Sequence, residues 1–158
     1  MSETVQVVSF KLGSEEYGVD IAQVQEINRM VAVTHVPRAP QFMEGVINLR
    51  GQLIPIIDLR ARFGMPRAEH TKNTRIVVTE IGSKRVGMVV DSVSEVLRLP
   101  VEQIEAAPDM IAGVDTEYIR GVGKIEDRLI ILLDLAKIIT GSEKRELESA
   151  EVEATAAA

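Results

Sequence analysis

The chain contains no cysteine and no tryptophan, and only three phenylalanines and two tyrosines among its 158 residues. Without cysteine there is no disulfide framework, no thiolate metal ligand and no thiol nucleophile. Aromatic side chains are the stacking platforms for single-stranded nucleic acid, so their scarcity argues against that ligand. The net charge of −6 argues the same way, because nucleic-acid binding needs a cationic surface. We therefore expect no nucleic-acid partner.

Long apolar runs are also missing. No run approaches the roughly 18 residues that span a bilayer, and the first residues, MSETVQVV, lack the basic start and apolar core of a secretory signal. The sequence therefore predicts a cytoplasmic protein without direct membrane insertion. The segment 141–158 carries five Glu against one Lys and one Arg, and we expect this acidic, alanine-rich tail to lie outside the folded body.

Side chains that support catalysis or metal binding are few. The two histidines, His35 and His70, lie in different contexts, so each is expected to be structural or at the surface. Four aspartates lie at the ends of strand-like runs: Asp20, Asp58, Asp91 and Asp134. Capping of the following turn is the role expected for them. We predict no metal, no cofactor and no enzymatic activity.

What the chain does contain is a series of short runs rich in Val and Ile, separated by turn signals. They include VQVVSFKL, GVINL, QLIPIIDL, RIVVTEI and RLIILLDL. This spacing indicates strands rather than helices. We expect an all-β chain built as a small barrel or sandwich.

Two of these regions resemble each other. Residues 45–59, GVINLRGQLIPIIDL, and residues 121–135, GVGKIEDRLIILLDL, are identical at six of fifteen positions at an offset of 76. The block Val24-x-Glu26-Ile27 likewise matches Val93-x-Glu95-Val96 at an offset of 69. The preserved order indicates a duplicated unit; the alternative is that two hairpins rich in Val and Ile simply look alike.

The polar segment 64–74, which carries Gly and Pro, is the expected linker between the two units. The predicted division is a first β-barrel over 1–70, a second over 71–140 and the tail over 141–158, and the N-terminal strand is open to sharing with the second barrel. Units of this size are marginal alone, so we expect them to pack against each other around a seam.

One charge, Arg50, interrupts the most apolar region. It falls with Gly51 at the turn of a predicted hairpin, where glycine supplies the positive φ of a tight turn. On the simplest interpretation Arg50 is an exposed turn residue. Its counterpart in the second unit is Glu126, however, so the two turns differ in charge. Pro55 favours an edge position or a bulge for the next strand, and a cation beside an open edge is a place for a partner to dock.

Several motifs together carry a family resemblance: YGVDI from Tyr17, VQEI from Val24, GVINLRG from Gly45 and IPIIDL from Ile54. They resemble the CheW family of bacterial chemotaxis coupling (adaptor) proteins over about residues 5–140. The resemblance implies two Src-homology-3-like five-stranded β-barrels around a hydrophobic seam, with short helical turns. It also implies a non-catalytic adaptor that bridges the cytoplasmic tip of chemoreceptors (methyl-accepting chemotaxis proteins) to the regulatory domain of the histidine kinase CheA. Such an adaptor is cytoplasmic and associated with membrane receptor arrays; self-association in the arrays is left open.

By the same resemblance, five residues are expected to contact the receptor tip: Val24, Glu26, Arg50, Val93 and Val96. A helix would lay an apolar stripe against the valines, while Arg50, held at the seam, offers a planar fork to a carboxylate or to carbonyls. From the residues alone, a core position is favoured for the valines, since valines in strands are core more often than interface. The resemblance assigns no residues to the kinase interface.

Two other classes of function stay open from the sequence. One is a different binding module, such as a regulatory fragment of the kinase or an adaptor of another two-component pathway; the start at Met1 and the Ala-rich end favour a stand-alone adaptor instead. The other is an enzyme, which the missing Cys and His chemistry disfavours.

Overall fold

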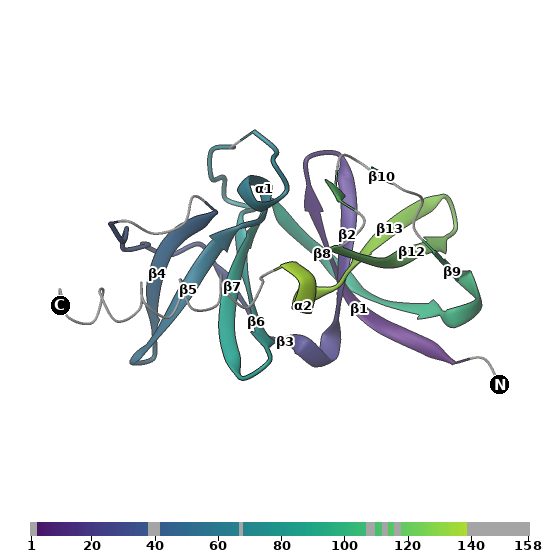
Figure 1. Cartoon of the computed structure of the whole chain (residues 1–158), viewed down its shortest axis with the longest axis horizontal. Coiled ribbons are helices and arrows are strands. Elements are labelled where there is room, and N and C mark those ends of the chain that lie inside the picture. Colours follow the sequence, from purple (N-terminus) through teal and green to yellow (C-terminus); the bar gives the residue numbers. More distant parts are fainter. Residues whose placement is uncertain are drawn as a thin grey trace.

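The computed structural model describes residues 3–37, 42–66, 68–106, 110–111, 114–115 and 118–138, and the predicted tail lies outside them. Most of these residues form two curled sheets, which lie side by side in Figure 1. The five-stranded sheet has the order β3 (Val24–Arg29), β6 (Arg75–Ile81), β7 (Lys84–Val90), β5 (Gln52–Asp58), β4 (Met43–Leu49). The six-stranded sheet has the order β8 (Ser92–Pro100), β1 (Thr4–Leu12), β2 (Glu15–Asp20), β13 (Arg128–Leu133), β12 (Ile119–Ile125), β9 (Ile104–Glu105).

The remaining elements are short. They are the 3-10 turns η1 (Ile21–Gln23) and η2 (Val101–Gln103), the helices α1 (Leu59–Arg62) and α2 (Leu135–Ile138), and the hairpin of β10 (Met110–Ile111) with β11 (Val114–Asp115). The predicted architecture, all-β with two barrels and short helical turns, is confirmed.

The two sheets share one topology. In the five-stranded sheet, β3, β6, β7, β5 and β4 occupy the places that β8, β1, β2, β13 and β12 occupy in the six-stranded sheet. Each sheet contains one parallel pair, β5 with β7 and β13 with β2. The common order supports a duplication over a chance likeness of two hairpins.

The sixth strand, β9, corresponds to an isolated pair of residues, Thr34 and Val46, in the five-stranded sheet. Glu105 of β9 pairs with Val122, and Thr34 pairs in the same way with Val46. The backbone bonds between Thr34 and Val46 are 2.8 and 2.9 Å long and close the five-stranded sheet on itself. Each unit is therefore a five-stranded barrel closed by one short bridge.

The predicted division at residue 70 does not describe the sheets. The five-stranded sheet is one continuous segment, β3 to β7, whereas the six-stranded sheet combines β1 and β2 with the strands that follow Asp91. The predicted linker 64–74 accordingly connects α1 to β6 within one barrel. The chain passes between the barrels at η1 and at Asp91 instead. Sequence could not show this, because local patterns locate strands but not their long-range partners.

The largest apolar cluster takes side chains from both sheets and fills the seam between them. All five aromatic residues of the chain lie in or against this cluster: Phe10, Tyr17, Phe42, Phe63 and Tyr118. Four of the rings form a row with centroid distances of 5.9, 5.9 and 5.8 Å, in the order Phe10, Tyr17, Phe63, Tyr118. Smaller clusters fill the interior of each barrel. The few aromatic residues therefore join the barrels.

The local predictions at the matched hairpins are confirmed. Arg50 and Gly51 have φ values of 52° and 84°, and Glu126, the counterpart of Arg50, has 53°. Asp58 accepts from Arg60 N at 3.0 Å and Asp134 from Ala136 N at 3.1 Å, so both cap a helical turn.

Of the two expectations for Pro55, an edge position or a bulge, the edge position is excluded, since β5 lies between β7 and β4. The β4–β5 ladder does shift its register beside Pro55, between Met43 and Gly45. Two details remove the cost of the missing N–H of Pro55. The ladder with β7 begins only at Ile56, and Val46, opposite Pro55, directs its backbone N–H and C=O to Thr34.

Candidate functional site

Four of the five residues expected to bind a partner lie on equivalent strands, β3 and β8, each the first strand in the order of its sheet. Both strands carry a bulge at the same place. The register of β3 against β6 shifts between Val24 and Glu26, and β8 pairs Val93 and Glu95 with consecutive residues of β1. A bulge bends a strand and redirects its side chains. The matched sequence blocks therefore encode a duplicated bulge.

Glu26 and Arg50 form a forked ion pair at one end of the five-stranded barrel. Arg50 Nη1 donates to Glu26 Oε1 at 3.3 Å, and Nη2 donates to Oε2. Asn28 Nδ2 donates to the same carboxylate at 3.0 Å. The Arg50 side chain is 70% exposed and that of Glu26 only 24%, so the cation covers the carboxylate and faces solvent.

Electrostatics at this pair follow from the hydrogen bonds. Donation from Arg50, then from Asn28, lowers the pKa of Glu26, and Arg85 adds a further favourable charge. The pKa of Arg50 is raised by its bond to Glu26. Both groups are therefore charged at neutral pH, and the carboxylate holds the guanidinium in place.

The three valines differ in exposure. Val24 and Val93 are half-buried and pack against the cluster at the seam. Val96 is 53% exposed and lies opposite Val8 of β1. Val24 and Val93 therefore serve the core at least in part, as the interpretation from residue type had allowed, while Val96 presents its side chain to solvent.

Arg50 was expected to be held at the seam between the barrels, but its side chain pairs within one barrel. Its ion pair with Glu26 lies within the five-stranded sheet, at the free end of the β4–β5 hairpin, which Figure 1 shows at the lower left. A two-residue turn extends from its strands, so its side chain reaches the neighbouring β3 rather than the other barrel.

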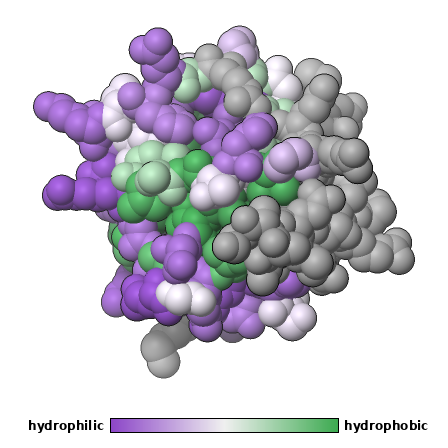
Figure 2. Space-filling view, turned by 90° about the vertical axis from the view of Figure 1, so that its left-hand side faces the viewer, coloured by the Kyte–Doolittle hydropathy of each residue, from purple (hydrophilic) through white to green (hydrophobic). Residues whose placement is uncertain are grey.

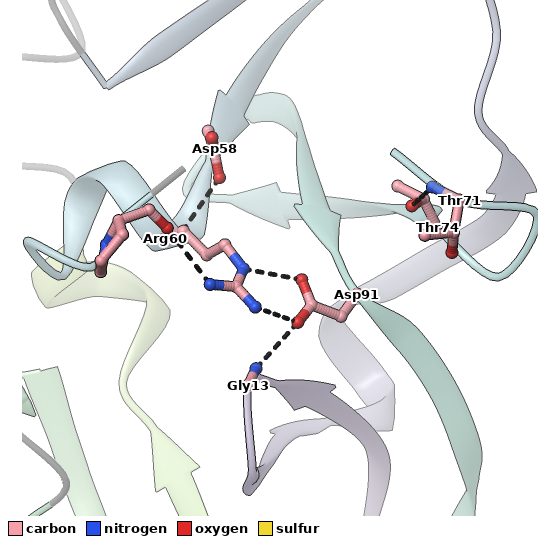
Figure 3. A network of polar contacts seen from close by, with 7 residues as sticks. Gly13, Asp58, Arg60, Thr71, Thr74 and Asp91 are labelled. Atoms are coloured by element: carbon pink, nitrogen blue, oxygen red, sulfur yellow. Dashed lines mark hydrogen bonds and ion pairs between the residues drawn. The ribbon is translucent and has the colours of Figure 1, made fainter. Parts of the chain in front are cut away.

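A different arginine bridges the barrels. Arg60 Nε donates to Asp91 Oδ1 at 2.9 Å and Nη2 to Oδ2 at 2.5 Å, and Gly13 N donates to the same carboxylate at 2.8 Å (Figure 3). Arg60 follows β5, Gly13 lies in the β1–β2 turn and Asp91 separates β7 from β8. From the sequence, Asp91 was expected only to cap a turn, because no local spacing links residues 13, 60 and 91.

Arg62, the last residue of α1, makes a second connection between the barrels. Its guanidinium carbon lies 5.2 Å from the ring centroids of both Phe42 and Tyr118, and its Nε donates to Ile138 O at 2.7 Å. An arginine stacked on two rings gains from both the apolar contact and the cation–π attraction. No local pattern in the sequence pointed to Arg62 either.

The equivalent end of the other barrel has a different charge arrangement. There Arg128 pairs with Glu16 and, at 3.0 Å, with Glu95, the counterpart of Glu26. The turn residue is Glu126, so the cation comes from the strand beside the turn instead of from the turn itself. The two ends are alike in fold and distinct in the position of their cation.

The histidines lie apart. His35 is exposed, and His70 is exposed with Nε2 3.7 Å from Glu44. In the part of the chain that the structure describes, no three His, Asp or Glu side chains gather as a metal site would require. Within the same residues, no helix has the length and apolar character needed to cross a membrane.

Apolar surface is present beside the strands of the site. Ile27 of β3 is 40% exposed and Val31, just beyond it, is 47% exposed. Figure 2 views the end of the molecule formed by the five-stranded sheet and shows hydrophobic atoms with hydrophilic side chains above, below and to the left of them. Apolar surface bordered by polar side chains is common at protein–protein interfaces.

Paired barrels, a duplicated bulge and an exposed, pre-positioned arginine beside apolar surface define a class of small protein-binding β proteins. The family model described as "CheW-like domain" matches residues 6–143. Chemotaxis protein CheW of Klebsiella aerogenes is 45% identical over 134 residues, which cover 85% of this chain and 81% of that protein. Chemotaxis protein CheW of Rhizobium meliloti is 39% identical, with 88% of this chain and 90% of that protein covered.

A solved structure gives the same answer. The scaffolding protein TtCheW from Thermoanaerobacter tengcongensis superposes with a TM-score of 0.83 at 37% identity, covering 89% of this chain and 96% of that one. The chain belongs to the CheW family.

Proposed function

We propose that this chain is a non-catalytic adaptor that couples the cytoplasmic tips of chemoreceptors to the regulatory domain of the histidine kinase CheA. It acts in the cytoplasm, at membrane-associated receptor arrays. The observation that carries the proposal is the likeness, over nearly all of the described chain, to proteins named as chemotaxis and scaffolding proteins.

The proposed receptor contact consists of Val24, Glu26, Arg50, Val93 and Val96. Among these residues Arg50 can make the strongest polar contact with a partner, because a guanidinium has five N–H donors in a rigid fork. Two of its nitrogens bind Glu26, and the exposed remainder faces solvent. Holding the side chain in advance reduces the entropy lost when a partner binds. Val96 adds exposed apolar area to which a helical partner can pack.

The test is a pair of titrations, one with purified receptor-tip fragments and one with the CheA regulatory domain, each alongside a thermal melt. Arg50→Ala is expected to weaken receptor binding roughly ten- to a hundredfold, as for loss of one charge-assisted hydrogen bond, and to leave the melt and kinase binding unchanged. Arg128→Ala, which removes the ion pair at the equivalent end of the other barrel, is the matched control and should retain receptor binding.

A charge exchange separates direct contact from support of the fold. The double variant Glu26→Arg with Arg50→Glu re-forms the ion pair but moves the cation from the turn to the strand. If Arg50 touches the receptor, binding stays lost in the double variant. Recovery of binding would show that only the pair matters and would remove Arg50 from the proposed contact. If the Arg50 variant loses binding to both the receptor tip and the kinase domain and melts at a lower temperature, Arg50 has a role in the fold instead.

A further inference from the structure

A hollow of about 500 Å³ lies where β3 ends and β6 begins, away from the Glu26–Arg50 pair. Its lining consists of Arg29, Met30 and residues 71–75. Three of these seven residues are cationic, namely Arg29, Lys72 and Arg75, and none is acidic. In a chain of net charge −6, a hollow whose charged lining residues are all cationic needs a physical explanation.

Two of the cations oppose each other directly. Arg29 of β3 and Arg75 of β6 are cross-strand partners in the antiparallel ladder. Like charges directly opposite in a sheet are destabilising, and Lys72 adds a third charge to the same hollow. Among the described residues none of the three is in an ion pair, although both sheets contain arginines that are paired with carboxylates.

The hollow is also held in shape before any ligand binds. Arg75 Nη1 donates to the carbonyls of Lys72 and Thr74, both at 2.9 Å, which fixes the guanidinium without neutralising it. The loop before it is closed by Thr71 N donating to Thr74 Oγ1 at 2.8 Å and Asn73 N donating to Thr71 Oγ1 at 3.1 Å (Figure 3 shows the two threonines). Such an arrangement lowers the entropic cost of binding.

We propose that this hollow, the Arg29–Arg75 pocket, binds an oxyanion with more than one negative charge. Two guanidinium groups match the oxygens of a phosphate or carboxylate, and a lysine adds an unoriented positive charge. The volume is larger than a single small ion needs and leaves room for a diphosphate. Binding such a ligand offsets the repulsion that the empty pocket retains.

The ligand chemistry has two available sources. One is a small phosphate-bearing molecule in solution. The other is the set of glutamates at 143, 146, 148, 151 and 153 of this chain, which follow the last described residue, Ile138, by 5 to 15 positions. Both sources present negatively charged acceptor oxygens to the pocket, and the experiment distinguishes the two sources.

Inorganic pyrophosphate titrated into the full chain provides the first arm, followed by amide chemical shifts and by thermal melting. Saturable one-to-one binding is expected, with the largest shifts in residues 71–75 and a melting temperature that rises with ligand. Arg29→Gln and Arg75→Gln should each weaken binding at least tenfold. Without ligand, Arg29→Gln should melt no lower than the wild type, because it removes a repulsion. Arg98→Gln, an exposed arginine of β8 in the other barrel, is the matched control and should bind normally.

The proposal is overturned if shifts grow without saturation, or if Arg98→Gln weakens binding as much as Arg29→Gln, since either result means unspecific attraction. The second arm uses a chain with the five tail glutamates changed to glutamine. Unchanged pyrophosphate affinity assigns the pocket to a free anion, and tighter binding shows that the tail competes for it; both support the oxyanion pocket.

Discussion

At the scale of single residues, the seam depends on a few polar groups that no local sequence pattern identifies. Asp91 binds Arg60 with both oxygens and also accepts from Gly13 N, so one carboxylate joins both barrels. These bonds, those from Arg60 first, lower the pKa of Asp91 despite its partial burial. The ionised form is therefore part of the folded state.

Asp91→Asn is expected to destabilise the fold by about 1–3 kcal/mol, the usual range for a charged hydrogen-bonding group at a partly buried site. Because the folded pKa is lowered, the contribution of Asp91 is fully present above the ordinary Asp pKa of about 3.9 and is lost as pH falls through it towards the folded value. Urea unfolding of both proteins at pH 7 and near pH 3.5 measures this. A stability difference that is the same at both pH values would contradict the role of the charge.

Tyr17, unlike Asp91, buries a polar group without a hydrogen bond to any described residue. Its ring is fully buried in the row of aromatics, and among the described residues its hydroxyl has no hydrogen-bond partner. Burial, and secondarily Glu15, raise the pKa of Tyr17.

Tyr17→Phe should stabilise the protein by about 1 kcal/mol, since it removes an unsatisfied buried hydroxyl and keeps the ring stack. A raised folded pKa means that stability is lost as pH rises above the ordinary tyrosine value of about 10, and the variant should lose less there. Thermal melts at pH 7 and pH 10.5 test both statements. A variant less stable than the wild type would show that the hydroxyl has a partner in solution.

At the scale of elements, the dipeptide Gly-Val that starts both matched regions has a structural reason. A Cβ on Gly45 would lie 2.2 Å from Thr34 O, and one on Gly121 would lie 2.9 Å from Glu105 O. Each glycine thus lets the closing bridge of its barrel approach. The glycine identity of the sequence comparison is therefore explained by barrel closure.

Gly45→Ala is expected to cost more than about 3 kcal/mol, because the new methyl group collides with backbone and φ is 152°. Gly64→Ala is the matched control. Gly64 also has a positive φ, 74°, but no atom lies within 4 Å of the added carbon, so only backbone strain of about 1 kcal/mol is expected. Denaturant midpoints of the two variants give the comparison. Equal losses would mean that the bridge to Thr34 contributes nothing to stability.

At the scale of the whole molecule, the two barrels share their largest core. The cluster at the seam contains side chains of β1, β2 and β13 from one sheet and of β5, β6 and β7 from the other. Separating the barrels would expose that area to water, at roughly 25 cal/mol per Å² of apolar surface.

Unfolding should therefore be a single cooperative transition. Tyrosine fluorescence reports on the seam, and far-ultraviolet dichroism reports on both sheets, so the two signals should give the same urea midpoint. A seam signal that is lost before the dichroism would show that the barrels fold as separate units, in which case the continuous segment 24–90 is the unit to isolate.

Much was determined by the sequence itself. Val- and Ile-rich runs become strands, Arg50-Gly51 becomes a hairpin turn, Asp58 and Asp134 cap helical turns, and the matched blocks become equivalent strands with equivalent bulges. All of these depend on interactions between near neighbours, which a local pattern records. The tertiary structure alone decided which strands share a sheet and which charges meet. Asp91 finds Arg60 and Gly13, and Arg50 turns to Glu26 rather than to the seam, because strand pairing over long separations fixes those positions.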